Sequence, residues 1–217
     1  MIAWAVAALL GCSGAVAIAI GIADQDAAPS AAPDSRSVAA SPSPRPEPQS
    51  GDRAPRGDAS DELDYSAPVR ITIPSIGVSS ELVDLGLDAA GVMETPQPVD
   101  KAGWFGPSPP PGIPGATVIA GHVTWDQEPM VFFELGELRP GDRVEVLRRD
   151  GATTIFEVSR TGSFPKSGFP TKAVYTQPER SELRLITCGG EYDEAAGRYL
   201  ANVIVWARLV DVRPAAT

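Results

Sequence analysis

The sequence contains only two cysteines and one histidine among its 217 residues. Cys12 lies in an apolar run, and Cys188 lies far from it in a different sequence environment. We therefore expect no disulfide between them and none of the disulfide framework of a small secreted domain. A zinc site of the usual type needs more Cys and His ligands than this chain has. Any chemistry based on a thiol or an imidazole is restricted to very few atoms.

Basic residues are also scarce, because 18 Lys and Arg stand against 28 Asp and Glu and the formal net charge is −10. A surface that binds the phosphate backbone of a nucleic acid needs a cluster of Lys and Arg. The sequence shows no such cluster. We therefore do not expect nucleic acid as a partner.

The first two regions of the chain differ sharply in composition. Residues 1–23 are almost wholly apolar, with no charged side chain before Asp24. A helix of this length can cross a hydrocarbon core of about 30 Å, so we predict a transmembrane helix that acts as a signal anchor. A cleaved signal peptide is the alternative. Residues 24–68 are rich in Pro, Ser and Ala and predict a disordered, semi-stiff linker that holds a domain away from a membrane.

Residues 69–213 alternate apolar segments with turn signals, which predicts a mainly β domain followed by a short tail at 214–217. The Asp150-Gly151 pair predicts a tight hairpin between Val144–Arg148 and Thr153–Val158. Only FFELGEL, residues 132–138, looks briefly helical. Strands spaced in this way favour a closed or nearly closed antiparallel barrel. The expected strands are 69–74, 79–87, 116–121, 143–149, 153–160, 182–187 and 199–210.

Cys188 and His122 both follow predicted strands. Cys188 comes after ELRLIT and before two glycines, which leave room for the backbone of a substrate. A thiolate is a strong nucleophile, although a lone cysteine is often only a small buried hydrophobe. His122 comes after ATVIAG, and an imidazole can exchange a proton with a thiol and later protonate a leaving amine. A surface or capping role is the alternative for the histidine.

Arg198 begins the last predicted strand, ten residues after Cys188. If the strands that carry them pair antiparallel, the two side chains face each other near one rim of the barrel. A guanidinium there would stabilise negative charge on a tetrahedral intermediate, and it cannot lose its proton. An exposed strand charge is the alternative. Together the three residues offer a nucleophile, a proton carrier and a fixed cation.

The segments VIAGHV, LITCGG and RYLANVIVWARL resemble the sortases, which are bacterial cysteine transpeptidases. The Thr-Cys pair, the upstream Gly-His pair and the downstream Arg occur in the sortase order and spacing. The stretches GWFGPSPPPGIPGATVIAGHV and FFELGELRPGDRVEV are similar to the actinobacterial group called class F. The resemblance covers residues 69–212.

This resemblance implies an eight-stranded sortase barrel with short helices and no cofactor. It implies that Cys188 attacks the Thr–Gly bond of a C-terminal sorting signal similar to LPXTG and forms a thioester acyl-enzyme. An amine, often on a cell-wall precursor, or water then resolves the thioester. By match of residues, His122 is the general acid/base, Arg198 stabilises the oxyanion and Thr187 shapes the substrate pocket. Thr124 stands where many relatives have an acidic residue, so the group that orients the imidazole stays open.

The resemblance also implies a single-pass protein of the cell membrane with an extracellular catalytic domain. Two other functions stay open. One is an L,D-transpeptidase-like peptidoglycan enzyme, whose signature has an Arg two residues after Cys, where this chain has Gly190. The other is a non-catalytic anchored β-barrel that only binds. We interpret Glu191, Asp193 and Glu194 as a solvated acidic loop and expect no metal.

Overall fold

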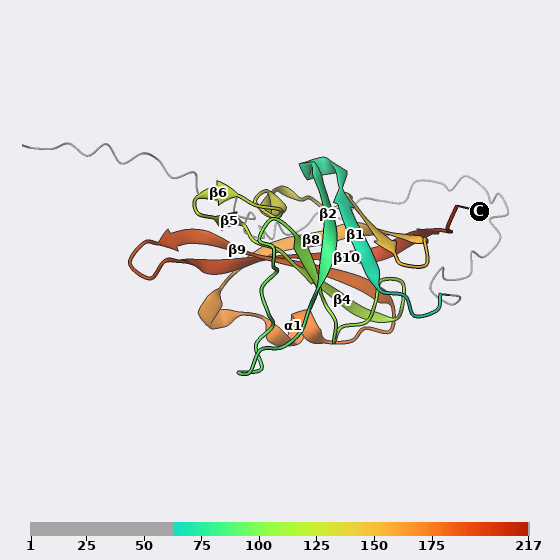
Figure 1. The fold of residues 1–217 in the computed structure, drawn as a ribbon, viewed down its shortest axis with the longest axis horizontal. Coiled ribbons are helices and arrows are strands. Elements are labelled where there is room, and N and C mark those ends of the chain that lie inside the picture. The colour runs from blue at the N-terminus through green and yellow to red at the C-terminus, as the bar shows by residue number, and fades with distance from the viewer. Residues whose placement is uncertain (1–62, 217) are drawn as a thin grey trace, which may run out of the picture.

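The structure is a computed structural model that describes residues 63–216. Its main feature is a closed barrel with the strand order β1-β2-β3-β4-β9-β10-β8-β7 (Figure 1). The barrel strands are β1 (Pro68–Ile73), β2 (Val78–Leu85), β3 (Ala102–Phe105), β4 (Gly115–Ala120), β7 (Arg143–Arg148), β8 (Thr153–Pro165), β9 (Ser181–Asp193) and β10 (Arg198–Arg213). The predicted mainly β, eight-stranded barrel is confirmed.

The remaining elements are short. Strands β5 (Thr124–Trp125) and β6 (Glu128–Pro129) form a small separate hairpin. Within residues 63–216, one α-helix, α1 (Thr171–Tyr175), packs on the sheet, and three 3-10 turns accompany it. They are η1 (Pro74–Ile76), η2 (Leu135–Glu137) and η3 (Lys166–Gly168). Residues 132–138 were predicted to be briefly helical, and of these only Leu135–Glu137 form a helical turn.

The expectation of an antiparallel barrel is wrong at two of its pairings. Strand β3 lies parallel to β2, and β9 lies parallel to β4. The long connection between β2 and β3 carries the chain back to the middle of β2, so that Ala102 pairs with Leu82. Parallel neighbours need such long crossovers, whereas antiparallel neighbours can be joined by a tight turn.

The alternation of residues along β9 sets the two faces of the sheet. Leu183 and Leu185 point into the barrel, where they pack in its main core. Ile186 points outward into a second apolar cluster with Trp206, which is completed by Val174 of α1. Cys188 is two residues beyond Ile186 and therefore belongs to the outer face.

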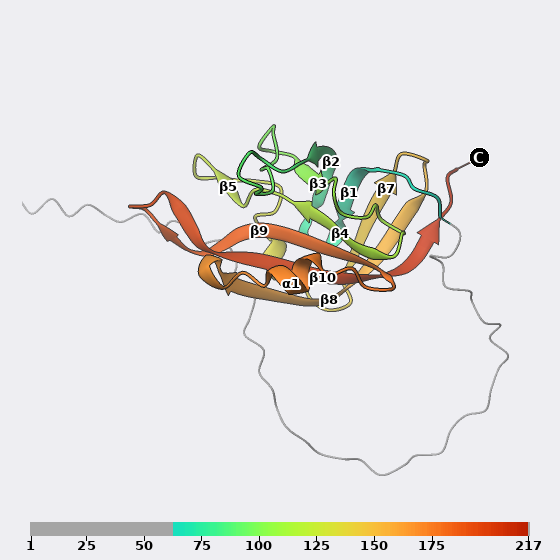
Figure 2. The ribbon, with the colours of Figure 1, turned by 90° about the horizontal axis from the view of Figure 1, so that it is seen from below.

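The sequence suggested that this strand ends just before Cys188. In the structure, β9 continues to Asp193. The ladder with β10 shifts register between Tyr199 and Ala201 and then resumes. Gly190 takes a φ of 76° at this irregularity, a conformation that favours glycine. The β9–β10 hairpin consequently projects beyond the barrel (Figures 1 and 2).

The predicted hairpin at Asp150-Gly151 is confirmed, because β7 and β8 pair antiparallel and Gly151 has a φ of 86°. Arg148 is buried beside this turn and donates a 2.6 Å hydrogen bond to a carboxylate oxygen of Asp150. This bond holds the pKa of the Asp150 carboxyl below its ordinary value. Arg148 also donates to the carbonyls of Asp64 and Pro111 and so ties the start of the domain to the barrel.

The transmembrane helix predicted at 1–23 lies outside the described residues, and so does most of the linker predicted at 24–68. The last residue of that linker range, Pro68, already begins β1. Within residues 63–216 no helix is both long and apolar enough to cross a membrane.

Candidate active site

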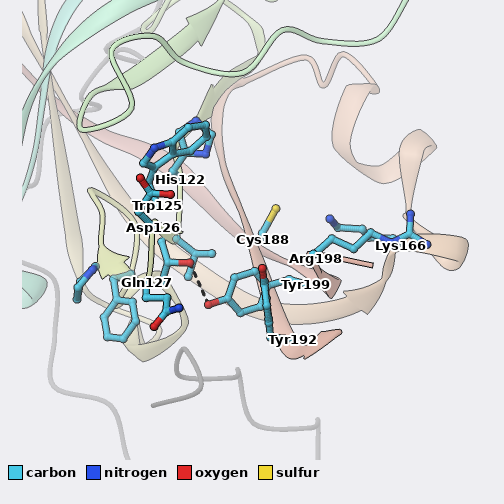
Figure 3. A pocket seen from close by; sticks show the side chains of 14 residues that line it. His122, Trp125, Asp126, Gln127, Lys166, Cys188, Tyr192, Arg198 and Tyr199 are labelled. Atoms are coloured by element: carbon cyan, nitrogen blue, oxygen red, sulfur yellow. Dashed lines mark hydrogen bonds between the residues drawn. The ribbon is translucent and has the colours of Figure 1, made fainter. Parts of the chain in front are cut away.

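A pocket of about 790 Å³ opens beside Cys188 (Figure 3). Cys188, His122 and Arg198 all line it. These residues come from β9, from the loop after β4 and from the start of β10, so three separate segments of the chain meet here. The β5–β6 hairpin forms one wall, with Asp126 and Gln127 at its turn.

Cys188 is half-buried and its thiol is free. Its cross-strand partner on β10 is Asn202, whose side-chain amide donates a 3.2 Å hydrogen bond to the carbonyl of Thr187. Gly189 packs tightly on Val203, since a Cβ at Gly189 would lie 2.7 Å from a methyl carbon of that valine. The backbone around the thiol is therefore fixed by close contacts, while the thiol itself faces the pocket (Figure 3).

His122 lies in the loop directly after β4, as the sequence predicted. The backbone carbonyl of His122 accepts a hydrogen bond from the N–H of Phe132. The ring atom Nε2 lies 3.3 Å from the carbonyl oxygen of Pro96, and the indole of Trp125 meets the imidazole edge-on at 5.5 Å between centroids. A proton on Nε2 would be donated to Pro96 and leave Nδ1 as the acceptor nitrogen. Among the described residues, a carbonyl and an indole thus orient the imidazole.

Thr124, which stands where many sortases have an acidic residue, does not orient the imidazole. Its hydroxyl lies 3.1 Å from the hydroxyl of Tyr199 rather than on the imidazole. Tyr199 in turn meets the ring of Tyr192 edge-on at 5.0 Å between centroids. These contacts join the β5–β6 hairpin to the projecting β9–β10 hairpin across the pocket mouth (Figure 3).

Thr187 is buried and is not among the residues that line the pocket. Its hydroxyl donates a 2.8 Å hydrogen bond to the carbonyl of Gly121. Thr187 therefore ties the strand of the cysteine to the loop of the histidine. Its expected part in shaping the substrate pocket stays a prediction.

Arg198 does not face Cys188 directly across the ladder, so that expectation is wrong. The register pairs Arg198 with Asp193 and pairs Cys188 with Asn202. The two side chains nevertheless share the pocket. Figure 3 shows Arg198 on the side of Cys188 away from His122.

The sequence placed the loop 164–171 at the groove but did not single out Lys166, which lines the pocket together with Arg198. Lys166 lies in the connection between β8 and β9, in a Pro- and Gly-rich stretch without periodicity. No local pattern distinguishes it from other exposed lysines. The acidic residues Glu191, Asp193 and Glu194 form no metal cluster, and no other group within residues 63–216 could hold a metal ion through three His, Cys, Asp or Glu side chains.

Comparison with known proteins gives consistent results. The model of the sortase domain matches residues 71–210. The fold is similar to sortase A from Listeria monocytogenes, with a TM-score of 0.53, 16% identity and coverage of 71% of this chain and 93% of that one. Sortase C-1 from Actinomyces oris gives a TM-score of 0.53, 25% identity and coverage of 69% and 77%.

A third solved structure, sortase A from Corynebacterium diphtheriae, gives a TM-score of 0.52, 22% identity and coverage of 70% and 65%. No curated protein matches the chain in sequence. The members of the matching family are cysteine transpeptidases. Because the family model spans well over half of the sequence, including every strand of the pocket, the chain belongs to the sortase family.

Proposed function

We propose that this chain is a membrane-anchored sortase, of the class F type, that cleaves an LPXTG-like C-terminal sorting signal outside the cell and transfers the protein to an amine. One observation carries this proposal: a free thiol, an imidazole and a guanidinium line the same open pocket. A nucleophile, a proton carrier and a fixed cation are what transfer of an acyl group through a thioester requires.

In the first half of the reaction the thiolate of Cys188 adds to the carbonyl carbon of the Thr–Gly bond. The carbonyl oxygen becomes negatively charged, and the guanidinium of Arg198 stabilises it. When this intermediate collapses the C–N bond breaks, and His122 gives a proton to the departing glycine amine. The products are a thioester on Cys188 and the free C-terminal peptide.

In the second half an acceptor amine attacks the thioester and gives a proton to His122. The C–S bond breaks and the thiolate of Cys188 is restored. Water in place of the amine gives hydrolysis. Because the pocket is open to solvent, both outcomes are accessible, and a cell-wall precursor is the acceptor that suits an anchored enzyme.

The L,D-transpeptidase alternative receives no support from the position two residues after the cysteine. Gly190 has a φ of 76°, and a Cβ there would lie 3.0 Å from the side chain of Ala201. An arginine at this position would therefore be strained. The guanidinium of the pocket belongs instead to Arg198.

The proposal is tested with the purified full-length chain and a fluorogenic peptide that contains an LPXTG signal. We expect slow cleavage that Cys188→Ala abolishes and that the matched variant Cys12→Ala retains. Cleavage that survives Cys188→Ala would exclude the mechanism. A wild-type chain that binds the peptide without cleaving it would favour the non-catalytic binding module.

A further inference from the structure

Lys166 and Arg198 are two cations in one pocket of a protein whose net charge is −10. Figure 3 shows them together, on the side of Cys188 opposite His122 and Trp125. Both side chains are exposed, and neither forms an ion pair or a hydrogen bond with another residue of the range 63–216. Their charges are therefore available to a ligand.

Among the described residues, the nearby carboxylates form no ion pair with these two cations. Asp193 is the cross-strand neighbour of Arg198, and its carboxylate accepts the backbone N–H of Ala196. Among the described residues that line the pocket, the one acid is Asp126, which lies on the opposite wall at the turn of the β5–β6 hairpin. The two sides of the pocket therefore carry opposite charges. The two cations lie beside Cys188, and the acid lies on the opposite wall.

The register of the sheet brings Lys166 near the thiol. Ala201 of β10 pairs with Pro165 on one side and with Gly189 on the other. Lys166 follows Pro165, and Cys188 precedes Gly189. Lys166 and Cys188 therefore lie on either side of the row of paired residues that contains Ala201. Their strands lie two spacings apart, roughly 10 Å, and the two residues are offset by two positions along the strands, roughly 7 Å, so their Cα atoms lie about 12 Å apart. A lysine side chain is long enough to reach a group that is bonded to Cys188 or adjacent to it.

We propose that Lys166, with Arg198 beside it, forms a subsite for a carboxylate of the ligand next to the reacting bond. This inference rests on the proposed function, since it concerns the ligand of the same thiol. Because Arg198 stabilises the oxyanion during bond breaking, we expect Lys166 to contribute most of the preference for a carboxylate. An ammonium attracts a carboxylate as a point charge, and the guanidinium adds a planar pair of donors.

The carboxylate can come from either of two sources, the sorting signal or the acceptor amine. In both cases the contact is partly exposed, so we expect a modest preference of about fivefold in kcat/KM over the matching amide. The preference should fall as salt is raised, because screening weakens exposed charge pairs.

The test uses the full-length chain in two arms. In the donor arm, two LPXTG peptides differ only in Glu or Gln at the X position. In the acceptor arm, one donor peptide is transferred to glycine or to glycinamide, whose carboxylate or amide lies directly beside the attacking amine. We expect the wild type to favour the carboxylate form about fivefold in one arm, which identifies the source.

The variant Lys166→Met should bring this ratio to about 1, whereas the matched variant Lys172→Met should keep it, because Lys172 is an exposed lysine of α1 that does not line the pocket. A wild-type ratio near 1 in both arms overturns the subsite while leaving the proposed function intact. A ratio that Lys166→Met leaves unchanged, or that is insensitive to salt in the wild type, also overturns it. Absence of any cleavage in all arms refutes the proposed function and the subsite with it.

Discussion

The hydroxyl of Thr187 donates a 2.8 Å hydrogen bond to the carbonyl oxygen of Gly121. Thr187 directly precedes Cys188, and Gly121 directly precedes His122. The N–H of Gly121 also donates to the carbonyl of Ile186, so two hydrogen bonds join the same short segments. Because the Thr187 bond is buried, water cannot replace it. The separation of thiol and imidazole therefore depends on how β9 and the loop after β4 are held together.

Replacing Thr187 with valine tests this link. The Gly121 carbonyl would lose a buried donor, and we expect the free energy of unfolding to fall by about 1–3 kcal/mol in urea titrations. We also expect a lower kcat with little change in the KM of the peptide, because Thr187 is buried and does not line the pocket. Thr187→Ser keeps the hydroxyl and should retain most of the activity. A raised KM with normal kcat would instead assign Thr187 to substrate binding.

A substitution at Gly121 tests the packing of the same region. A Cβ at this position would lie 2.6 Å from a ring carbon of Phe132 and 2.8 Å from a methyl carbon of Val131. We expect Gly121→Ala to lower the free energy of unfolding by about 1–3 kcal/mol and to lower kcat, because the loop that holds His122 must shift. The matched control is Gly168→Ala, since a Cβ there meets nothing within 4 Å. Equal stability and turnover of both variants would contradict this packing argument.

Arg198→Lys keeps the positive charge in the pocket but removes the planar guanidinium. If Arg198 stabilises the oxyanion, kcat should fall by about 10- to 1000-fold, as for the loss of an oxyanion donor. The control Arg143→Lys changes an exposed arginine of β7 and should leave kcat unchanged. Near-normal turnover of Arg198→Lys would show that Arg198 has only a structural role.

The Arg148–Asp150 pair predicts how stability depends on pH. The hydrogen bond from Arg148 lowers the pKa of Asp150 in the folded protein. A depressed folded pKa stabilises the protein above the ordinary Asp range, and this stabilisation is lost as the pH falls through the folded pKa. Asp150→Asn should therefore be less stable near neutral pH and should lose less stability between pH 5 and pH 2. Parallel acid-unfolding curves for the two proteins would contradict this linkage.

The parts of the fold that depend on local pattern could be predicted from the sequence. Alternation located the strand at 182–187, whose Leu183 and Leu185 lie in the core, and the Asp150-Gly151 pair located a hairpin. Strand β3 was missed because all four of its residues are buried and show no alternation. Its parallel pairing with β2 depends on a long connection whose path no local pattern reports.

The same distinction holds for the candidate site. Cys188, His122 and Arg198 could be singled out because a thiol and an imidazole are so rare in this chain and because their order resembles that of the sortases. The register shift that pairs Arg198 with Asp193 is a property of the formed ladder. The carbonyl of Pro96 beside the imidazole could not be foreseen, because a backbone contact from a distant loop leaves no signature in residue type.

The most direct test of the central claim is intact mass spectrometry of the full-length chain after brief incubation with an LPXTG peptide and rapid acid quenching. We expect a mass increase equal to the peptide portion that ends at the threonine, and peptide mapping should place it on the thiol of Cys188. The adduct should disappear when an amine acceptor is added. Cleavage of the peptide without any adduct on Cys188, or an adduct that persists in Cys188→Ala, would contradict the account.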